Sequence, residues 1–149
     1  MHERSDKAWR KAYARLEELE RSILPPGEGL DGFHEALNSA RVAESKGVLM
    51  YSRVSQWTLD AKVRLTEAKL LYLSKKRALR ARATLAYSDQ EDVLAPYAEK
   101  VARRDLEHQR LRAYLDCIDR LLSNVKHFRE DLSKKLKVIE IERQVAGES

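Results

Sequence analysis

Eight consecutive residues near the middle of the chain carry side chains suited to binding phosphate. The segment Lys75-Lys76-Arg77-Ala78-Leu79-Arg80-Ala81-Arg82, here called the basic segment, holds five basic residues and no acidic one. Ammonium and guanidinium groups form charge-assisted hydrogen bonds with phosphate oxygens, and guanidinium can form two in parallel. The alternative interpretation is an ordinary solvated helix face, on which opposite charges usually alternate four residues apart.

The excess of positive charge is local to this part of the chain. Nine basic and two acidic residues lie between Arg53 and Arg82, a net charge of +7, whereas the whole chain carries +5. The two acids are Asp60 and Glu67, and no further acid occurs before Asp89. This distribution favours a surface for an anionic partner over a mixed-charge solvated face.

Binding of a single nucleic-acid strand without sequence preference needs cations along the backbone and aromatic rings on which bases stack. Tyr72 and Tyr87 flank the basic segment. A core position is the preferred interpretation for Tyr72, and for Tyr87 both interpretations stay open. No helix-turn-helix or zinc-finger pattern indicates base-edge recognition. The predicted DNA contacts are Lys62, Lys69, Lys75, Lys76, Arg77, Arg80, Arg82 and Tyr87.

Catalytic and metal-binding patterns are absent from the sequence. There is no Gly-rich phosphate loop after a strand, no nucleophile elbow and no His-Glu-x-x-His. The four histidines are scattered, and the single Cys117 cannot form an intrachain disulfide. A packed thiol is the preferred interpretation of Cys117. We therefore predict a protein that is not an enzyme and needs no cofactor or metal.

The elements that must position the basic segment are long helices. Charged residues make up 36% of the chain and aromatic residues 7%, a composition typical of coiled coils and long helices. Gly and Pro cluster at residues 25–32, and only Gly47 and Pro96 occur between Phe33 and Ala146. The sequence predicts an all-α fold of three helical segments.

The first predicted segment runs from about Ser5 to Ser22 and has one apolar face. Pro25-Pro26-Gly27 separates it from the rest, which predicts an N-terminal helix and linker over 1–30 and a hairpin domain over 31–149. This helix could dock on a partner or fold back on its own chain, and the sequence leaves both alternatives open.

The second segment is predicted from an N-cap at Asp31 to about Ala86, with Gly47 as a place for a bend or a break. Two apolar stripes lie on nearly opposite sides of this helix, so a hairpin covers only one of them. The first stripe is Met50, Val54, Trp57, Ala61, Leu65, Ala68, Tyr72, Leu79, Ala83 and Ala86. The second predicts self-association through Leu59, Val63, Leu70 and Leu73.

The third segment is predicted to run to about Val145 and to end at Gly147. An N-cap at Asp92 is the preferred start because it leaves Pro96 in the first turn, whereas a capping box of Ser88 and Glu91 would place Pro96 deeper in the helix. Its heptad-spaced stripe is Leu111, Leu115, Ile118, Leu122, Val125, Arg129, Leu132, Leu136 and Ile139. The two long segments should form an antiparallel, coiled-coil-like hairpin that assembles into a homo-oligomer. Leu122, Leu132, Leu136 and Ile139 are predicted to contribute to that assembly.

The basic segment, Trp57 placed 18 residues before Lys75, and the run Leu49-Met50-Tyr51-Ser52-Arg53 together resemble the phage UvsY recombination mediator family. The C-terminal region from Leu115 to Gly147 is also similar to that family's closing helix, whereas residues 1–30 have no counterpart. The resemblance implies a ring-like homo-oligomer, a hexamer or heptamer, that binds single-stranded DNA. It further implies a role in helping a RecA-like recombinase displace single-strand-binding protein, with Arg80 and Arg82 contacting DNA.

Two other functions remain open at this point. The first is a non-enzymatic coiled-coil scaffold or adaptor whose basic helix binds an acidic protein. The second is an RNA-binding or membrane-associating helix, although no bulky apolar residues accompany the basic face as membrane binding requires. The N-terminus has no apolar core of signal-peptide length, and no run of about 18 apolar residues occurs, so we expect a cytoplasmic protein.

Overall fold

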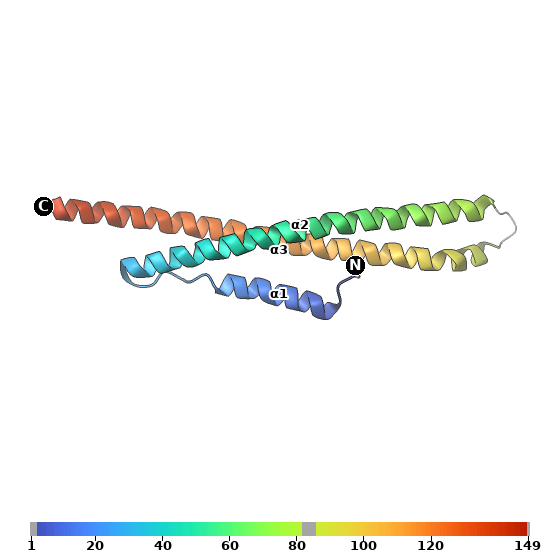
Figure 1. Cartoon of the computed structure of the whole chain (residues 1–149), viewed down its shortest axis with the longest axis horizontal. Helices are drawn as coiled ribbons and strands as arrows, with labels where there is room; N and C mark the ends of the chain where they lie inside the picture. The colour runs from blue at the N-terminus through green and yellow to red at the C-terminus, as the bar shows by residue number, and fades with distance from the viewer. Residues whose placement is uncertain (1–2, 82–85, 149) are drawn as a thin grey trace. The chain divides into compact units, whose positions relative to one another are not determined.

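The computed structural model describes residues 3–81 and 86–148, and all of the regular structure in these ranges is helical (Figure 1). The three helices are α1 (Asp6–Arg21), α2 (Gly29–Ala81) and α3 (Tyr87–Glu148). The long helices α2 and α3 pack against each other as a hairpin (Figure 1). The predicted all-α class and the predicted hairpin are therefore confirmed.

The chain divides into two compact units. Unit 1 consists of residues 1–6 and 53–115, and unit 2 consists of residues 7–52 and 116–149. Each unit contains a part of α2 and the part of α3 that packs on it. The predicted domain division at residue 30 stays a prediction.

In unit 2, α2 presents small residues to large residues of α3. Ala36, Ala40 and Ala43 are fully buried, and Gly47 continues the same stripe. A Cβ atom at Gly47 would lie only 2.6 Å from Cδ2 of Leu122, so the absence of a side chain lets the helices come close. The helix is continuous through this glycine, so of the two predicted alternatives the break is wrong.

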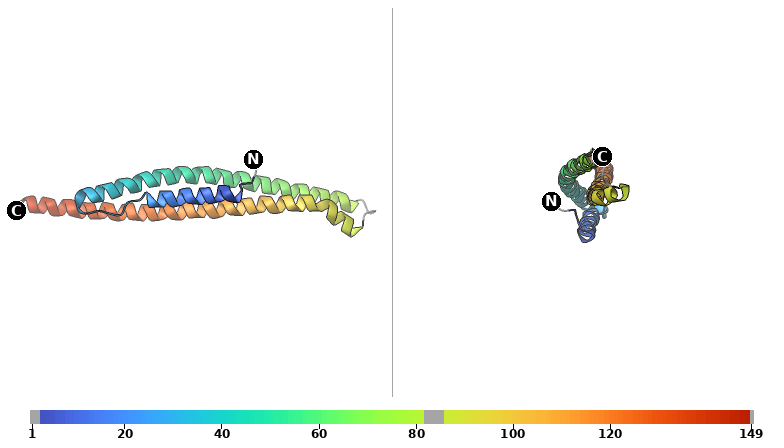
Figure 2. Two further views of the ribbon diagram at one scale, coloured as in Figure 1. Left: turned by 90° about the horizontal axis from the view of Figure 1, so that it is seen from below. Right: turned by 90° about the vertical axis from the view of Figure 1, so that its right-hand side faces the viewer.

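The N-terminal helix folds back on its own chain. Trp9, Leu16 and Leu19 form its buried face, and α1 lies beside the part of α3 that follows residue 116 (Figure 2). In the connection to α2, the backbone N–H of Leu24 donates a 2.9 Å hydrogen bond to Oγ of Ser39. The sequence left open whether this helix docks on a partner or folds back on its own chain, and the structure shows the second arrangement.

In unit 1, the apolar stripe of α2 predicted from Met50 onward faces the hairpin partner. Its buried members within the unit are Val54, Ala61, Leu65, Ala68 and Leu79. Leu111 and Tyr114 of α3 are buried in the same unit. This packing fixes the rotation of α2, and with it the directions in which the other α2 side chains point.

The described boundaries of the two long helices differ from the predicted ones at both ends of each helix. Helix α2 begins two residues before Asp31, at Gly29, whose φ of 76° favours glycine. Asp31 therefore lies in the first turn and acts on the helix dipole, not as the N-cap. The helix ends at Ala81; Ala83, a member of the predicted stripe, lies outside the described residues, and Ala86 lies beyond the helix end.

Helix α3 begins five residues before the predicted start, at Tyr87, and Pro96 lies inside it. The carbonyl of Ala86 accepts a 3.0 Å hydrogen bond from the N–H of Gln90, so the first helical turn is already closed there. The acidic residues of the first turns favour this early start through the helix dipole, whereas the sequence interpretation gave Pro96 too much weight. The helix also continues through Gly147.

Two leucines that were predicted for contacts between copies are buried inside the chain. Leu132 and Leu136 pack with Ala36 and Leu37 of α2 in unit 2, while Leu122 and Ile139 are half-buried. The hairpin itself thus accounts for the burial of Leu132 and Leu136. Over the residues that the structure describes, no helix has the length and hydrophobicity needed to cross a bilayer.

The packing of α3 predicts that Ile118→Ala destabilises the protein by about 2–5 kcal/mol, because Ile118 is fully buried and its truncation leaves a cavity. Ile141, on the same helix, is 54% exposed, so Ile141→Ala should stay within about 0.5 kcal/mol of wild type. Urea unfolding followed by circular dichroism measures both. Equal midpoints for the two variants would contradict the described core.

Candidate nucleic-acid interface

The candidate interface is built on the part of α2 that belongs to unit 1. Leu79 is buried in the hairpin, and the basic residues around it point away from that core. Lys75, Arg77 and Arg80 are exposed, and Lys76 is half-buried. With the exposed Lys62 and Lys69, these residues are here called the α2 cations.

Two lysines of the basic segment lie over aromatic rings. Nζ of Lys75 is 5.6 Å from the ring centroid of Tyr97 on α3, and Nζ of Lys76 is 5.9 Å from the ring centroid of Tyr72. Such contacts hold the methylene stems against the hairpin while the ammonium groups stay near solvent. Tyr72 and Tyr97 are both half-buried, which agrees with the core position preferred for Tyr72. The sequence did not point to Tyr97, because this residue comes close to Lys75 only through the packing of α3 against α2.

The α2 cations have no acidic partner within the described part of the chain. None of the ion pairs found within 4.0 Å among residues 3–81 and 86–148 includes one of them. Basic residues elsewhere do pair, for example Arg110 with Asp6 at 3.3 Å. An exposed cation without a partner keeps its hydrogen-bond donors available for an external anion.

Helix α3 adds positive charge next to Lys62 and Lys69. Burial lowers the pKa of the His108 imidazole below its usual 6.5, and the nearby Arg112 cation lowers it further. Lys62 and Lys69 act on this pKa in the same direction, and Asp105 opposes them. All three cations therefore lie close enough to His108 to disfavour its protonated form. Sequence reasoning missed Arg112 and His108 because this proximity depends on the register of the hairpin.

The N-terminal residues neutralise arginines of α3 in unit 1. Arg104 pairs with Glu3 at 3.2 Å, and Arg110 pairs with Asp6. These contacts were invisible in the sequence because about a hundred residues separate the partners. Their effect is to neutralise part of the positive charge that α3 carries in unit 1.

Arg4 anchors the same N-terminal segment. Its guanidinium donates a 2.7 Å hydrogen bond to Oε1 of the buried Glu107 and lies 4.5 Å from the ring centroid of Trp57. A buried carboxylate needs such a partner, and the flat guanidinium suits the face of an indole ring. Trp57, noted above for its spacing from Lys75, is thus a packing residue of unit 1.

Two predicted contacts lie outside what the structure describes. Arg82 falls in the segment 82–85, outside the described residues, and so does the side chain of Tyr87, although Tyr87 is the first residue of α3. Their roles stay predictions.

Unit 2 has a second basic cluster near the end of α3 that is compensated in part. Arg129 donates a 2.8 Å hydrogen bond to Glu44 of α2. Lys134, Lys135 and Lys137 are exposed, on the helix that also carries the acidic Glu130 and Asp131. These three lysines match the α2 cations in charge and exposure, so they provide a control surface on the same molecule.

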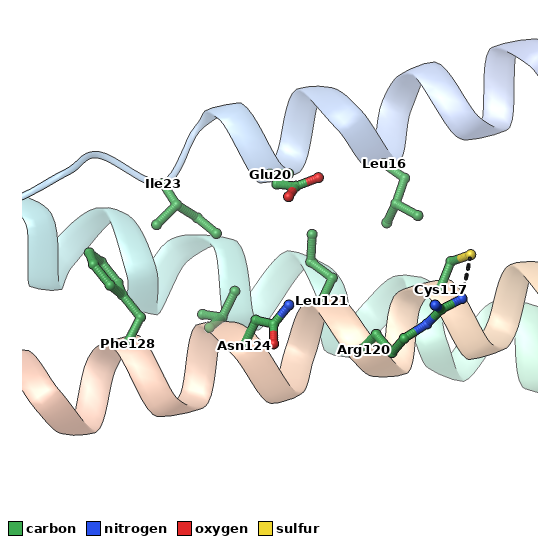
Figure 3. A pocket seen from close by; sticks show the side chains of 9 residues that line it. Leu16, Glu20, Ile23, Cys117, Arg120, Leu121, Asn124 and Phe128 are labelled. Atoms are coloured by element: carbon green, nitrogen blue, oxygen red, sulfur yellow. Dashed lines mark hydrogen bonds between the residues drawn. The ribbon is translucent and has the colours of Figure 1, made fainter.

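A hollow of about 630 Å³ lies between α1 and α3 in unit 2 (Figure 3). Leu16, Ile23, Leu121 and Phe128 give it apolar walls, and its polar lining is Glu20, Arg120, Asn124 and Cys117. The Cys117 thiol is half-buried and accepts a 3.5 Å hydrogen bond from the Arg120 guanidinium. Within the described residues, no three His, Cys, Asp or Glu side chains gather as metal ligands. The hollow contains no paired nucleophile and base.

Comparisons with known proteins do not assign a function to this geometry. No family model, no curated protein and no solved structure matches the chain. The function has to be inferred from the residues themselves, and the resemblance to the UvsY family stays a prediction.

The cluster around His108 predicts a titration that depends on lysines of the other helix. The ring protons of His108 should titrate below pH 6.5, and Lys62→Gln with Lys69→Gln should move the midpoint upward, as followed by NMR. Because the native state then binds this proton less readily than the unfolded chain, His108 lowers stability as pH falls below about 6.5. Lys134→Gln with Lys135→Gln is the control. An equal response to both pairs would refute the cluster.

Proposed function

We propose that the chain is a non-enzymatic protein that binds single-stranded DNA without sequence preference through the α2 cations. The observation that carries the proposal is a run of basic side chains on one helix, nearly all exposed, with Glu67 as the only acid between Lys62 and Arg80 and no acidic partner among the described residues. Phosphates supply the missing negative charge at regular intervals, and each neutralised phosphate releases a counterion.

An aromatic ring beneath one of the lysines favours a single strand over a duplex. Tyr97 lies next to the ammonium group of Lys75, where an unstacked base can reach the ring after the lysine turns to a phosphate. A duplex keeps its bases stacked and offers only its backbone to such a surface. Stacking is tolerant of sequence because every base has an aromatic face.

The proposal extends to a role as a recombination mediator in the cytoplasm. It rests on the resemblance of the basic segment, Trp57 and the 49–53 run to the UvsY family. In this role the protein is a homo-oligomer that presents a strand to a RecA-like recombinase and helps it displace single-strand-binding protein. Several copies of a weak site in one assembly raise the overall affinity without any new contact.

Removal of three α2 cations should weaken single-strand binding strongly and change its salt dependence. For Lys75→Ala, Arg77→Ala and Arg80→Ala together, the slope of log K against log salt should become shallower by about 2, at about 0.7 per lost contact. The control Lys134→Ala, Lys135→Ala and Lys137→Ala removes equal charge and should leave the slope near wild type. Fluorescence anisotropy with a labelled oligonucleotide measures both.

The same titrations separate the proposal from its rivals. Equal losses in the two triple variants would show that overall charge, and not this surface, holds the strand. A wild-type protein that binds no DNA at low salt would exclude nucleic-acid binding and favour a scaffold with an acidic protein partner. Tighter binding to duplex than to single strand would contradict the proposed stacking.

Loading of a recombinase tests the mediator role separately. Wild-type protein should speed the assembly of a RecA-like recombinase on an oligonucleotide covered with single-strand-binding protein, and the α2 triple variant should not. Filament assembly is followed by the ATPase activity of the recombinase. Single-strand binding without any acceleration would restrict the protein to a strand-binding function.

A further inference from the structure

Helix α2 in unit 1 has an apolar stripe that the hairpin leaves uncovered. Leu59 and Val63 are each 57% exposed, Leu70 is 62% exposed and Leu73 is 44% exposed. At 100° per residue these side chains point about 120–180° away from Ala61 and Ala68, which are buried in the hairpin. The stripe is therefore a second packing face of the same helix.

The spacing of this stripe is that of a coiled-coil seam. From Leu59 to Leu73 the intervals alternate between four and three residues when Thr66 is included. Val63 and Leu70 then occupy the a positions of the heptad, and Leu59 and Leu73 occupy d positions. The next a position is Arg77, which ends the apolar seam at the start of the basic segment.

The charges beside the seam are sorted by sign. The two g positions next to the seam are Lys62 and Lys69, and the e positions are Asp60 and Glu67. Lys62, Lys69 and Glu67 are exposed, and Asp60 is half-buried. One shoulder of the stripe is thus basic and the other acidic.

This sorting distinguishes the two ways in which a second helix can lie on the seam. In a parallel pair, the g residue of one helix meets the e residue five positions later on the other, so Lys62 meets Glu67 of the second copy, twice by symmetry. In an antiparallel pair, g meets g and e meets e, which opposes lysine to lysine and acid to acid. The charges favour the parallel pair and disfavour the antiparallel one.

We propose that two copies of the chain pair through α2 in parallel and in register, with Leu59, Val63, Leu70 and Leu73 as the seam. The inference deepens the self-association included in the proposed function and rests on it. The occupant of the stripe is a second copy because the basic shoulder of one chain complements the acidic shoulder of the same sequence when the two helices are parallel.

Basic residues of the same chain lie near Glu67 and could compete with Lys62 of the second copy. Glu67 also lines a small hollow of unit 1 with Arg64, Lys100 and Arg104. Arg104 already pairs with Glu3, and no ion pair between Glu67 and another described residue lies within 4.0 Å. Glu67 therefore remains available to Lys62 of the second copy.

Parallel pairing has a consequence for the candidate interface. It brings the two basic segments to the same end of the dimer, directly beyond Leu73. Arg77 of each copy then lies beside Arg77 of the other, and this repulsion is relieved when a polyanion lies between them. One strand can thus contact both basic segments at once.

Charge reversal at the shoulders tests the geometry without DNA. For the full chain, sedimentation equilibrium at low salt should show dimers that Lys62→Glu weakens about fivefold and Glu67→Lys weakens similarly. A fivefold change corresponds to about 1 kcal/mol, the scale of exposed ion pairs. The double variant Lys62→Glu with Glu67→Lys should regain wild-type affinity. Circular dichroism confirms that each variant keeps its helices.

A change in dimer affinity in the opposite direction would identify an alternative arrangement. In an antiparallel pair, Lys62→Glu and Glu67→Lys would each strengthen the dimer, because each converts a repulsion into an attraction. A wild-type oligomer insensitive to all three variants would show that another surface mediates assembly. A wild-type monomer at all concentrations would overturn both this pairing and the proposed self-association, whereas strand binding by the α2 cations would still be measured separately.

Disulfide trapping tests independently whether the two α2 helices pair in parallel and in register. On a Cys117→Ser background, Leu59→Cys alone and Leu73→Cys alone should each form crosslinked dimers on mild oxidation, because d positions face each other in a parallel pair. In an antiparallel pair d positions lie opposite a positions, so neither variant alone would form the crosslink. That result would overturn the proposal.

Discussion

Close packing along one heptad-spaced stripe of α2 determines which of the other α2 side chains face solvent. In unit 2 the stripe consists of small residues such as Ala40 and Gly47, which let α3 approach closely. In unit 1 it continues through larger residues such as Leu65. Because helical side chains are fixed in direction by the rotation of their helix, this seam alone determines which side chains of α2 face outward. In unit 1, burying Leu65 and Ala68 leaves Leu70 and Arg77 exposed to solvent.

The packing of α2 against α3 also leaves two kinds of surface on the outer side of α2. An apolar stripe with one basic and one acidic shoulder runs along residues 59–73, and cations without acidic partners in the described chain follow it. The N-terminal residues reinforce this division by neutralising Arg104 and Arg110 on α3. A surface of this kind suits a protein that acts by assembling and by holding a polyanion.

Much of this architecture could be predicted from the sequence because it depends on periodicity. The 3-4 spacing of Leu111 to Ile139 and the two faces of α2 led directly to a hairpin with one face uncovered. The alanines at 36, 40 and 43 gave no such signal, because alanine is common on every face of a helix. The contact between Arg4 and Glu107 and the grouping of Arg112 with Lys62 depend on tertiary register, which periodicity does not encode. The start of α3 was misplaced because a proline was allowed to outweigh several acidic residues.

Lysine footprinting tests the central claim most directly, because it reports which cations a bound strand covers. Acetylation of the wild-type protein is compared by mass spectrometry with and without a single-stranded oligonucleotide at low salt. The account predicts protection of Lys75 and Lys69, with Lys134 and Lys135 modified to the same extent in both samples. Protection of Lys134 and Lys135 with unchanged reactivity at Lys75 would contradict the assignment of α2 as the strand-binding helix.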